Sequence, residues 1–364
     1  MKCESTVEDI RKAIIDADRC TGKNLALPVL SHILMTAYGE ELTLRATNVS
    51  VGIEITVPAT VSKEGITLIR GDIVSSFLAG CPQNQKVSFE LKDDLLIVST
   101  KTNKISLKTF SHEDFPTLPT VHGGALITLP AEVVADGLKS VVFSAAMSDI
   151  KPEIGSVYLY TEDDRIVFVA TDSFRLAEKK IMLKKPVSIK PSLIPSKNAL
   201  EILRLLDEVS GNVTLTFSDT QCAISYNGTY LTTRLTSGTF PDYTQIIPKN
   251  PTTEVILLRQ DLLSVLKLSS VFSDKFNQVT IQVDPKAGVT LYAKNTDVGE
   301  QNSTLEAAVT GDAVSVNVNQ RYLLDSFQAI KDDSVVLQLS GNKPLIIRGV
   351  HDTSFVYLVM PMNR

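Results

Sequence analysis

One pattern occurs three times along this chain of 364 residues, and it limits the possible fold more than any other feature of the sequence. The three segments, residues 42–54, 166–178 and 289–300, read LTLRATNVSVGIE, IVFVATDSFRLAE and VTLYAKNTDVGE. In each, apolar residues alternate with polar ones as in a strand, and an alanine, a short polar turn and a second short run follow. These alanines are 124 and 123 residues apart and are Ala46, Ala170 and Ala293. A repeat of domain length predicts three domains of one fold.

The residues before each repeated segment have the spacing of an amphipathic helix. Apolar residues three or four positions apart lie on one helical face and are expected to pack against the strands. The three sets are Val7, Ile10, Ile14 and Ala17, then Val134, Leu138 and Val141, then Leu262, Leu266 and, less regularly, Ser269.

A second helical stretch follows each repeated segment and leads into another strand. The stretches are GDIVSSFLAG before KVSFEL, SKNALEILRLLDE before NVTLTF, and NQRYLLDSFQAIKDD before SVVLQL. Asp72, Ser196 and Asn319 stand near their starts and are predicted N-caps, because a short polar side chain can accept a hydrogen bond from the first turn.

Each repeat closes on a strand and a proline, in FPTLP (115–119), FPDY (240–243) and VMPM (359–362). The proline-rich stretches are typical of junctions. The sequence therefore predicts an α+β protein of three tandem domains, each with two helices packed on mostly antiparallel sheets, at residues 1–123, 124–250 and 251–364. The junctions are short and carry apolar residues, which favours packed domains over domains on flexible linkers.

Composition limits the setting of the chain. Hydrophobic residues make up 43% and the formal net charge is −5, so any contact with nucleic acid has to come from a locally basic surface. No stretch has the length and apolarity of a signal peptide or a membrane span. The four cysteines are scattered, which favours reduced thiols in a cytoplasmic protein over disulfides or a zinc site; they are Cys3, Cys20, Cys81 and Cys222.

Four segments make the repeat pattern specific. They are LPVLSHILM near the start, ATDSFRLA in the middle, FPDYTQIIPKN at the second junction and YLVMPMNR at the end. In this order, the chain resembles the bacterial DNA polymerase III beta-subunit family, the beta sliding clamps, over its whole length. The resemblance implies three similar domains per chain and two chains closed head to tail into a ring around duplex DNA, with the helices lining the pore. It also implies a processivity factor without catalysis or cofactor, which binds the replicative polymerase, the clamp loader and repair proteins.

The size of a ring can be estimated independently. Helices packed ~8–10 Å apart form a circle roughly 34 Å across when twelve stand side by side. Subtracting one helix diameter of ~11 Å leaves an opening of roughly 23 Å. Six helices leave only about 6 Å, too narrow for a duplex whose major groove alone is ~12 Å wide. A homodimer is therefore expected, because one chain cannot encircle DNA.

A sliding clamp needs weak attraction to phosphates that does not depend on base sequence. The helices carry the cations that would supply it: Arg11, Lys12, Arg19, Lys139, Lys197, Arg204, Lys267, Arg321 and Lys331, with Lys23 just beyond the first helix. The resemblance adds two loops that touch DNA, which correspond to Lys23 and Asn24 and to Ser148 and Lys151. Family members often have arginine where Asn24 stands. The alternative for each cation is an ordinary solvated helix face.

The resemblance also implies a groove between the second and third domains that binds short linear peptides. Its walls correspond to Ile154, Thr171, Ser173, Phe174, Arg175, Leu176, Pro241, Gln245, Ile246, Asn342, Pro344, Leu358, Met360, Pro361 and Met362. Methionines adapt to varied ligands, and Arg175 is expected to offer a donor at the rim. The alternative, core at a domain junction, stays open for Leu176 and Ile246. Two positions depart from the family, Phe174 in place of a common histidine and the Asn363-Arg364 ending.

The resemblance places the dimer seam between the first domain of one chain and the third domain of the other. Ile105 and Leu107, on an edge strand, would meet Val271 and Phe272 of the partner. An unpaired edge strand invites continuation of the sheet, and two identical head-to-tail contacts close a ring. Separate packing of each pair within its own domain is an equally good interpretation of the residues.

The sequence also bears on two other classes of function, an enzyme and a passive scaffold. The four histidines lie far apart without an HExxH pattern, GxGxxG is absent, and TGK at 21–23 lacks the upstream glycine of a phosphate-binding loop. No catalytic or metal-ligating set is therefore predicted. The remaining alternative is a passive three-domain interaction scaffold that never encircles DNA, and trapping on circular but not linear duplex separates it from a clamp.

Overall fold

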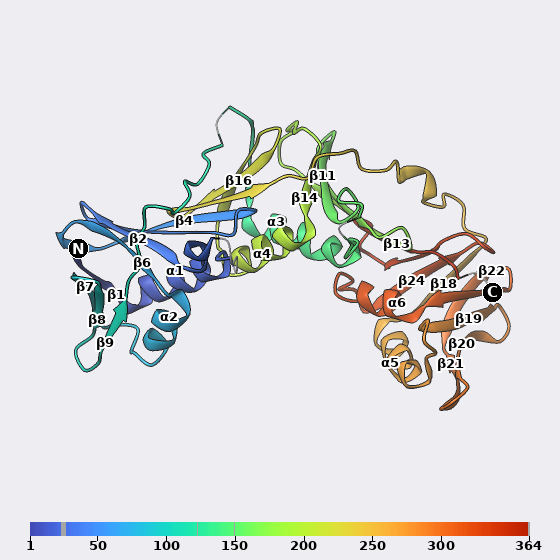
Figure 1. Cartoon of the computed structure of the whole chain (residues 1–364). Helices are drawn as coiled ribbons and strands as arrows, with labels where there is room; N and C mark the ends of the chain where they lie inside the picture. Colours follow the sequence, from blue (N-terminus) through green and yellow to red (C-terminus); the bar gives the residue numbers. More distant parts are fainter. Residues whose placement is uncertain (23–26, 122, 149, 363–364) are drawn as a thin grey trace. The chain divides into compact units, whose positions relative to one another are not determined.

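The computed structural model describes residues 1–22, 27–121, 123–148 and 150–362 (Figure 1). Two compact units make up the chain, and each is described by itself. Unit 1 comprises residues 1–132 and 204–235, and unit 2 comprises residues 133–203 and 236–364. Within the described ranges, no helix has the length and apolarity needed to cross a membrane.

Unit 1 holds two sheets and two helices, α1 (Val7–Arg19) and α2 (Gly71–Ala79). The five-stranded sheet has the order β5 (Thr60–Lys63), β1 (Lys2–Thr6), β7 (Lys86–Lys92), β8 (Leu95–Ser99), β9 (Lys104–Lys108). The eight-stranded sheet has the order β10 (Ala125–Pro130), β15 (Asn212–Phe217), β16 (Gln221–Tyr226), β17 (Thr229–Arg234), β4 (Val51–Pro58), β3 (Glu41–Thr47), β2 (Ile33–Tyr38), β6 (Gly65–Ile69). Strands β4 and β17 pair, so this sheet joins the first repeat to part of the second.

Unit 2 also holds two sheets. The nine-stranded sheet has the order β14 (Ser192–Pro195), β11 (Ser156–Glu162), β12 (Arg165–Thr171), β13 (Arg175–Met182), β26 (Phe355–Val359), β25 (Leu345–Gly349), β24 (Ser334–Leu339), β18 (Thr253–Leu258), β22 (Ala307–Gly311). The four-stranded sheet has the order β21 (Gly299–Leu305), β20 (Gly288–Asn295), β19 (Gln278–Asp284), β23 (Val314–Asn319). Pairing of β13 with β26 makes one sheet of the second and third repeats.

Two further helix pairs belong to the second and third repeats. They are α3 (Ala131–Val141) with α4 (Ser196–Leu206), and α5 (Arg259–Ser269) with α6 (Gln320–Ser326). Four short 3-10 helices complete the helical content of the described residues: η1 (Pro28–Ser31), η2 (Val142–Ser144), η3 (Thr244–Ile246) and η4 (Ser270–Phe272). The prediction of two helices per repeat, packed with antiparallel strands, is confirmed.

The three repeated segments form three equivalent hairpins, β3–β4, β12–β13 and β20–β21. The alanines that recur in the three segments, Ala46, Ala170 and Ala293, are all buried. In the first repeat, α1 lies against β3 and β4.

The predicted helical faces are the buried faces. All four apolar residues proposed for α1 are fully buried, as are the three proposed for α5. Thr6 caps α1, where its hydroxyl accepts a hydrogen bond from the backbone N–H of Asp9 at 3.1 Å. The four cysteines are free and buried, and burial raises the pKa of Cys3 to about 11.

The three residues predicted as N-caps differ in their position at the helix starts. Asn319 caps α6, where its side chain accepts from the N–H of Arg321 at 2.9 Å. Ser196 is the first residue of α4. The prediction for Asp72 is wrong, since α2 begins one residue earlier, at Gly71, and Arg70 in the cap position makes no capping bond. The carboxylate of Asp72 instead binds the guanidinium of Arg70 at 2.6 Å.

Close packing of α3 on the second hairpin depends on Gly137. A Cβ at this position would lie 2.3 Å from the ring of Phe168, a fully buried residue of β12. Gly137→Ala should therefore lower the free energy of unfolding by about 1–3 kcal/mol through overpacking. This loss comes despite the gain of about 1 kcal/mol that alanine normally brings to a helix.

Denaturant unfolding of the full chain measures the effect. Gly80→Ala is the matched control, because the nearest atom to its added Cβ is 3.7 Å away and its φ of −84° suits any residue. Equal stability of Gly137→Ala and the parent would show that α3 does not pack on Phe168 in this way.

Candidate peptide-binding site

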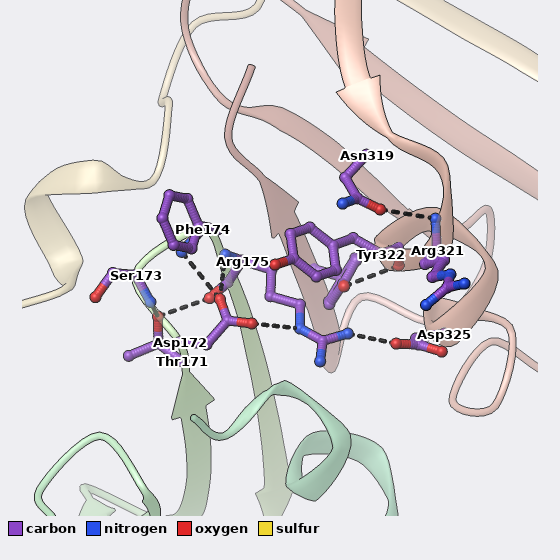
Figure 2. A network of polar contacts seen from close by, with 10 residues as sticks. Thr171, Asp172, Ser173, Phe174, Arg175, Asn319, Arg321, Tyr322 and Asp325 are labelled. Carbon is purple, nitrogen blue, oxygen red and sulfur yellow. Dashed lines mark hydrogen bonds and ion pairs between the residues drawn. The ribbon is translucent and has the colours of Figure 1, made fainter. Parts of the chain in front are cut away.

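The turn between β12 and β13, residues 171–175, presents an exposed aromatic side chain. One carboxylate oxygen of Asp172 accepts from the N–H groups of Phe174 and Arg175 at 2.9 and 3.0 Å (Figure 2). The hydroxyl of Thr171 accepts from the N–H of Ser173 at 3.1 Å, and Ser173 has a φ of 77°. These bonds fix a tight turn that leaves Phe174 62% exposed.

The same turn occurs in the first repeat. Thr47 and Asn48 there accept the equivalent backbone N–H bonds, and Val49 has a φ of 75°. The turn is therefore common to the first two repeats and not peculiar to the site, whereas in the third repeat Asn295 instead accepts from the N–H of Asp297. Only the threonine is common to both turns; the first repeat has Ser50 in place of Phe174 and Val51 in place of Arg175.

The guanidinium of Arg175 is enclosed. Its side chain is 10% exposed, and it binds Asp172 at 2.9 Å and Asp325 of α6 at 2.5 Å. It also lies 4.5 Å from the ring centre of Tyr322 (Figure 2). Burial by itself would lower the pKa of Arg175, but Tyr357 and the two carboxylates raise it, so the charge is permanent. The two carboxylates thus hold Nε and Nη1 of Arg175, and its role as a donor at the rim stays a prediction.

The C-terminal segment runs past this turn. The N–H of Met360 donates to the carbonyl of Phe174, and the N–H of Met362 donates to the carbonyl of Asn317, both at 2.8 Å. Met360 is 37% exposed, and Pro361 and Met362 are half-buried. This segment is therefore bound on both sides, and removing residues 360–364 would disturb the fold more than their place at the chain end suggests.

A groove of about 550 Å³ adjoins Met360. Its lining residues come from the second junction, the β24–β25 turn and the C-terminal segment, and are Gln245, Ile246, Ile247, Pro248, Lys249, Asn250, Lys343, Pro344 and Met360. Four of these were predicted from the sequence, namely Gln245, Ile246, Pro344 and Met360. Asn342 is exposed in the same turn as Pro344.

Tyr243 anchors the junction wall of the groove. It is 5% exposed, its hydroxyl donates to Glu178 of β13 at 2.5 Å, and its carbonyl accepts from the N–H of Ile246 at 3.1 Å. Burial and the bond to Glu178 raise the pKa of the Tyr243 phenol, which stays protonated. The groove wall is thus tied to the same strand that begins at Arg175.

Other predicted wall residues lie outside the groove. Leu176 and Leu358 are 1% exposed and belong to the hydrophobic core. Leu176 is therefore a core residue, as the alternative interpretation proposed, whereas Ile246 is 43% exposed and is not. Ile154 is half-buried, Thr171 is buried, and Ser173 and Pro241 are exposed. Sequence reasoning missed Tyr322 and Asp325, because they have no motif, and it missed Lys249 and Lys343.

Several cations proposed to meet DNA are paired with carboxylates. Lys12 of α1 lies 2.8 Å from Glu208 and 3.7 Å from Asp16, and Arg19 lies 3.4 Å from Asp16. Burial by itself would lower the pKa of Lys12, but the hydrogen bond to Glu208 raises it. Among the other positions proposed to meet DNA, Arg11 is half-buried, and Lys331 is exposed and pairs with Asp136. The rest are exposed: Lys139, Ser148, Lys151, Lys197, Arg204, Lys267 and Arg321. Lys23 and Asn24 lie outside the described residues.

The residues proposed for the dimer seam lie at two sheet edges. Ile105 and Leu107 are half-buried on β9, the last strand of its sheet. Val271 is 61% exposed and Phe272 is half-buried, both in η4. The 3-10 helix η4 contacts β21, the last strand of the four-stranded sheet.

Three tandem α+β repeats, each with a helix pair, define the chain as a protein of the DNA-clamp class. It belongs to the DNA polymerase III beta-subunit family. The family's N-terminal domain matches residues 1–119, its central domain residues 128–242 and its C-terminal domain residues 244–363. The resemblance found in the sequence and the predicted fold class are confirmed.

Relatives cover the whole chain at low identity. The beta sliding clamp of Synechococcus elongatus is 26% identical over 92% of each chain, and that of Escherichia coli K12 is 24% identical over 100% of each. The crystal structure of the DNA polymerase III beta subunit from Thermotoga maritima matches with a TM-score of 0.94 at 22% identity, over 100% of this chain and 99% of the other. The clamp from Pseudomonas aeruginosa bound to griselimycin also gives 0.94 at 22% identity, over 100% of each.

Asp325 should matter because it holds Arg175, and Arg175 ends the turn that carries Phe174. Asp325→Ala leaves an enclosed guanidinium with one carboxylate instead of two. We expect the free energy of unfolding to fall by about 1–2 kcal/mol, since Asp325 is itself partly exposed. Thermal or denaturant unfolding measures the change.

Asp312→Ala, which removes an exposed carboxylate from the loop between β22 and β23, is the matched control and should be neutral. Two variants of equal stability would mean that the Arg175–Asp325 pair contributes nothing to the fold.

Proposed function

We propose that the chain works as a DNA sliding clamp in the cytoplasm. Each chain contributes three domains, at residues 1–123, 124–250 and 251–364. Two copies join head to tail into a ring of six domains, and the ring encircles duplex DNA. It catalyses no reaction, and it holds the replicative polymerase and other partners on DNA. Membership of the beta-subunit family over the full chain, with a helix pair in each of three repeats, is the observation that carries this proposal.

Two strands that end their sheets in the described part of the chain, β9 and β21, support the head-to-tail seam. Strand β9 alternates polar and apolar residues, with Lys104 and Lys108 exposed at its ends and Ile105 and Leu107 half-buried. Strand β21 carries exposed Glu300 and lies against η4. Pairing β9 of one chain with β21 of the other would satisfy both edges and set lysine against glutamate.

The paired cations of α1 suit a ring that has to move along DNA. A carboxylate beside Lys12 weakens the attraction between that lysine and a phosphate, so contacts stay weak and exchange easily. We infer that exposed Lys139, Lys267 and Arg321 contribute with α1 to the pore surface, and Ser148 and Lys151 through their loop.

The groove beside Met360 suits recruitment of partners through short peptides. Ile246, Ile247 and Met360 offer an apolar surface, and Phe174 is exposed on the neighbouring turn. Peptide affinity concentrates in a few such contacts, so one groove can serve several partners in turn.

Trapping on DNA tests the ring. A closed ring loaded by a clamp loader should stay on nicked circular duplex and slide off linear duplex. Val271→Glu should abolish retention and give monomers in sedimentation, because the seam would bury an unpaired charge. Val271 is 61% exposed in the single chain, so the substitution leaves the fold intact.

Leu126→Glu, which changes an apolar residue of similar exposure on β10, is the matched control and should stay dimeric and trapped. Equal retention on circular and linear DNA by the parent protein would refute the ring. A dimeric, trapped Val271→Glu variant would refute only the seam.

The pairing of Lys12 with Glu208 gives a second test, in which a substitution is expected to strengthen DNA association. Glu208→Gln removes the carboxylate and frees Lys12 for phosphates. We expect DNA association to strengthen by about two- to fivefold at low salt and its salt dependence to steepen. Lys12→Ala should do the opposite, and both effects should be independent of base sequence. Fluorescence titration of a duplex at several salt concentrations measures them, and an unchanged salt slope in both variants would place Lys12 away from DNA.

A further inference from the structure

The charge of the groove beside Met360 is opposite to that of the whole chain. Among the described residues, its lining includes two lysines, Lys249 and Lys343, and no aspartate or glutamate. The chain as a whole has 41 acidic and 36 basic side chains. A cationic groove on an acidic protein favours ligands that carry negative charge.

The two lysines are not neutralised as Lys12 is. Both are exposed, and among residues 1–22, 27–121, 123–148 and 150–362 no carboxylate forms an ion pair with either one. By contrast, Lys12 and Lys331 each lie within 3 Å of a carboxylate oxygen. The ammonium groups of Lys249 and Lys343 are therefore available to a ligand.

Ser340 ties the two lysine-bearing segments together. Its carbonyl accepts from the N–H of Lys343 at 3.0 Å, and its hydroxyl donates to the carbonyl of Asn250 at 3.4 Å. The hydroxyl also accepts from the N–H of Thr252 at 2.9 Å. Both backbones are thus held at fixed places on the groove, and only the lysine side chains have to adjust to a ligand.

The same groove has an apolar surface from Ile246, Ile247, Pro248, Pro344 and Met360, beside the amides of Gln245 and Asn250. We propose that Lys249 and Lys343 make the groove selective for acidic peptides, in which carboxylates flank an apolar side chain. The apolar side chain packs on Ile246 and Met360, and the carboxylates pair with the two ammonium groups. The proposal rests on the proposed function of the groove and names the chemistry of its partners.

Peptide selection tests this without a known partner. A random twelve-residue display library is selected on the full-length parent, on Lys249→Ala/Lys343→Ala, on Lys286→Ala and on Met360→Ala. Peptides recovered on the parent should be enriched in aspartate and glutamate next to apolar residues. The double variant should lose the acidic enrichment and keep the apolar one, because its apolar lining is unchanged.

Lys286→Ala is the matched control for charge, since Lys286 is an exposed lysine of the β19–β20 turn that does not line the groove. It should select the same acidic peptides as the parent. An absence of acidic enrichment on the parent, or the same enrichment on the double variant, would overturn the proposal. Loss of enrichment in Lys286→Ala would also overturn it, by tracing the preference to net charge. If recovery is equal on Met360→Ala and the parent, the groove is not the peptide site and the proposed function of the groove fails as well.

Titration of one selected peptide by fluorescence anisotropy gives the size of the effect. The double variant should bind it about three- to tenfold more weakly, with a smaller dependence on salt. Three forms of the peptide identify the carboxylate: the parent peptide, one with glutamine and asparagine in place of the acids, and one with an amidated C-terminus. If either modified peptide binds the parent protein more weakly, but binds the double variant as well as the unmodified peptide does, the pairing is supported. The modification that weakens binding then shows whether side-chain carboxylates or the C-terminal carboxylate pair with the lysines. Weakening by neither change would contradict it.

Discussion

The site depends on one pairing, that of β13 with β26. The two strands run antiparallel with Arg175 opposite Val359, so the start of β13 and the end of β26 lie at the same place on the sheet. The turn that precedes Arg175 and the segment that follows Val359 must therefore emerge side by side. The hydrogen bond between Met360 and Phe174 is the direct result. Residues almost two hundred positions apart meet because a ladder register brings them together.

Local patterns allowed much of the fold to be predicted. The helical faces, the hairpins and their buried alanines depend on neighbours a few residues away, and periodicity shows such neighbours directly. The place of Phe174 and Met360 in the site came from resemblance to a family. The enclosure of Arg175 could not be predicted, since its partner Asp325 lies 150 residues away. The same holds for Lys12 and Glu208, which lie 196 residues apart.

Repetition explains why the site needed few special residues. The turn that displays Phe174 has the same backbone hydrogen bonds as the turn of the first repeat, where Val51 replaces Arg175. The shape of the turn is thus common to the first two repeats. Its contacts with the third repeat include the hydrogen bond from Met360 to the carbonyl of Phe174 and those of Arg175, which is held by Asp325 and by the ring of Tyr322. A turn shared by two repeats thus becomes a specific site through a few changed side chains, above all Phe174 and Arg175.

Burial of all four cysteines has a practical consequence for studying how such a protein moves. At neutral pH a thiol with a pKa of about 11, such as that of Cys3, has almost no reactive thiolate, and burial also keeps reagents away. The native chain should therefore give little background in maleimide labelling. One cysteine placed on an exposed edge would be the single reactive thiol per chain, so a dye pair attached there could report opening and closing in single molecules.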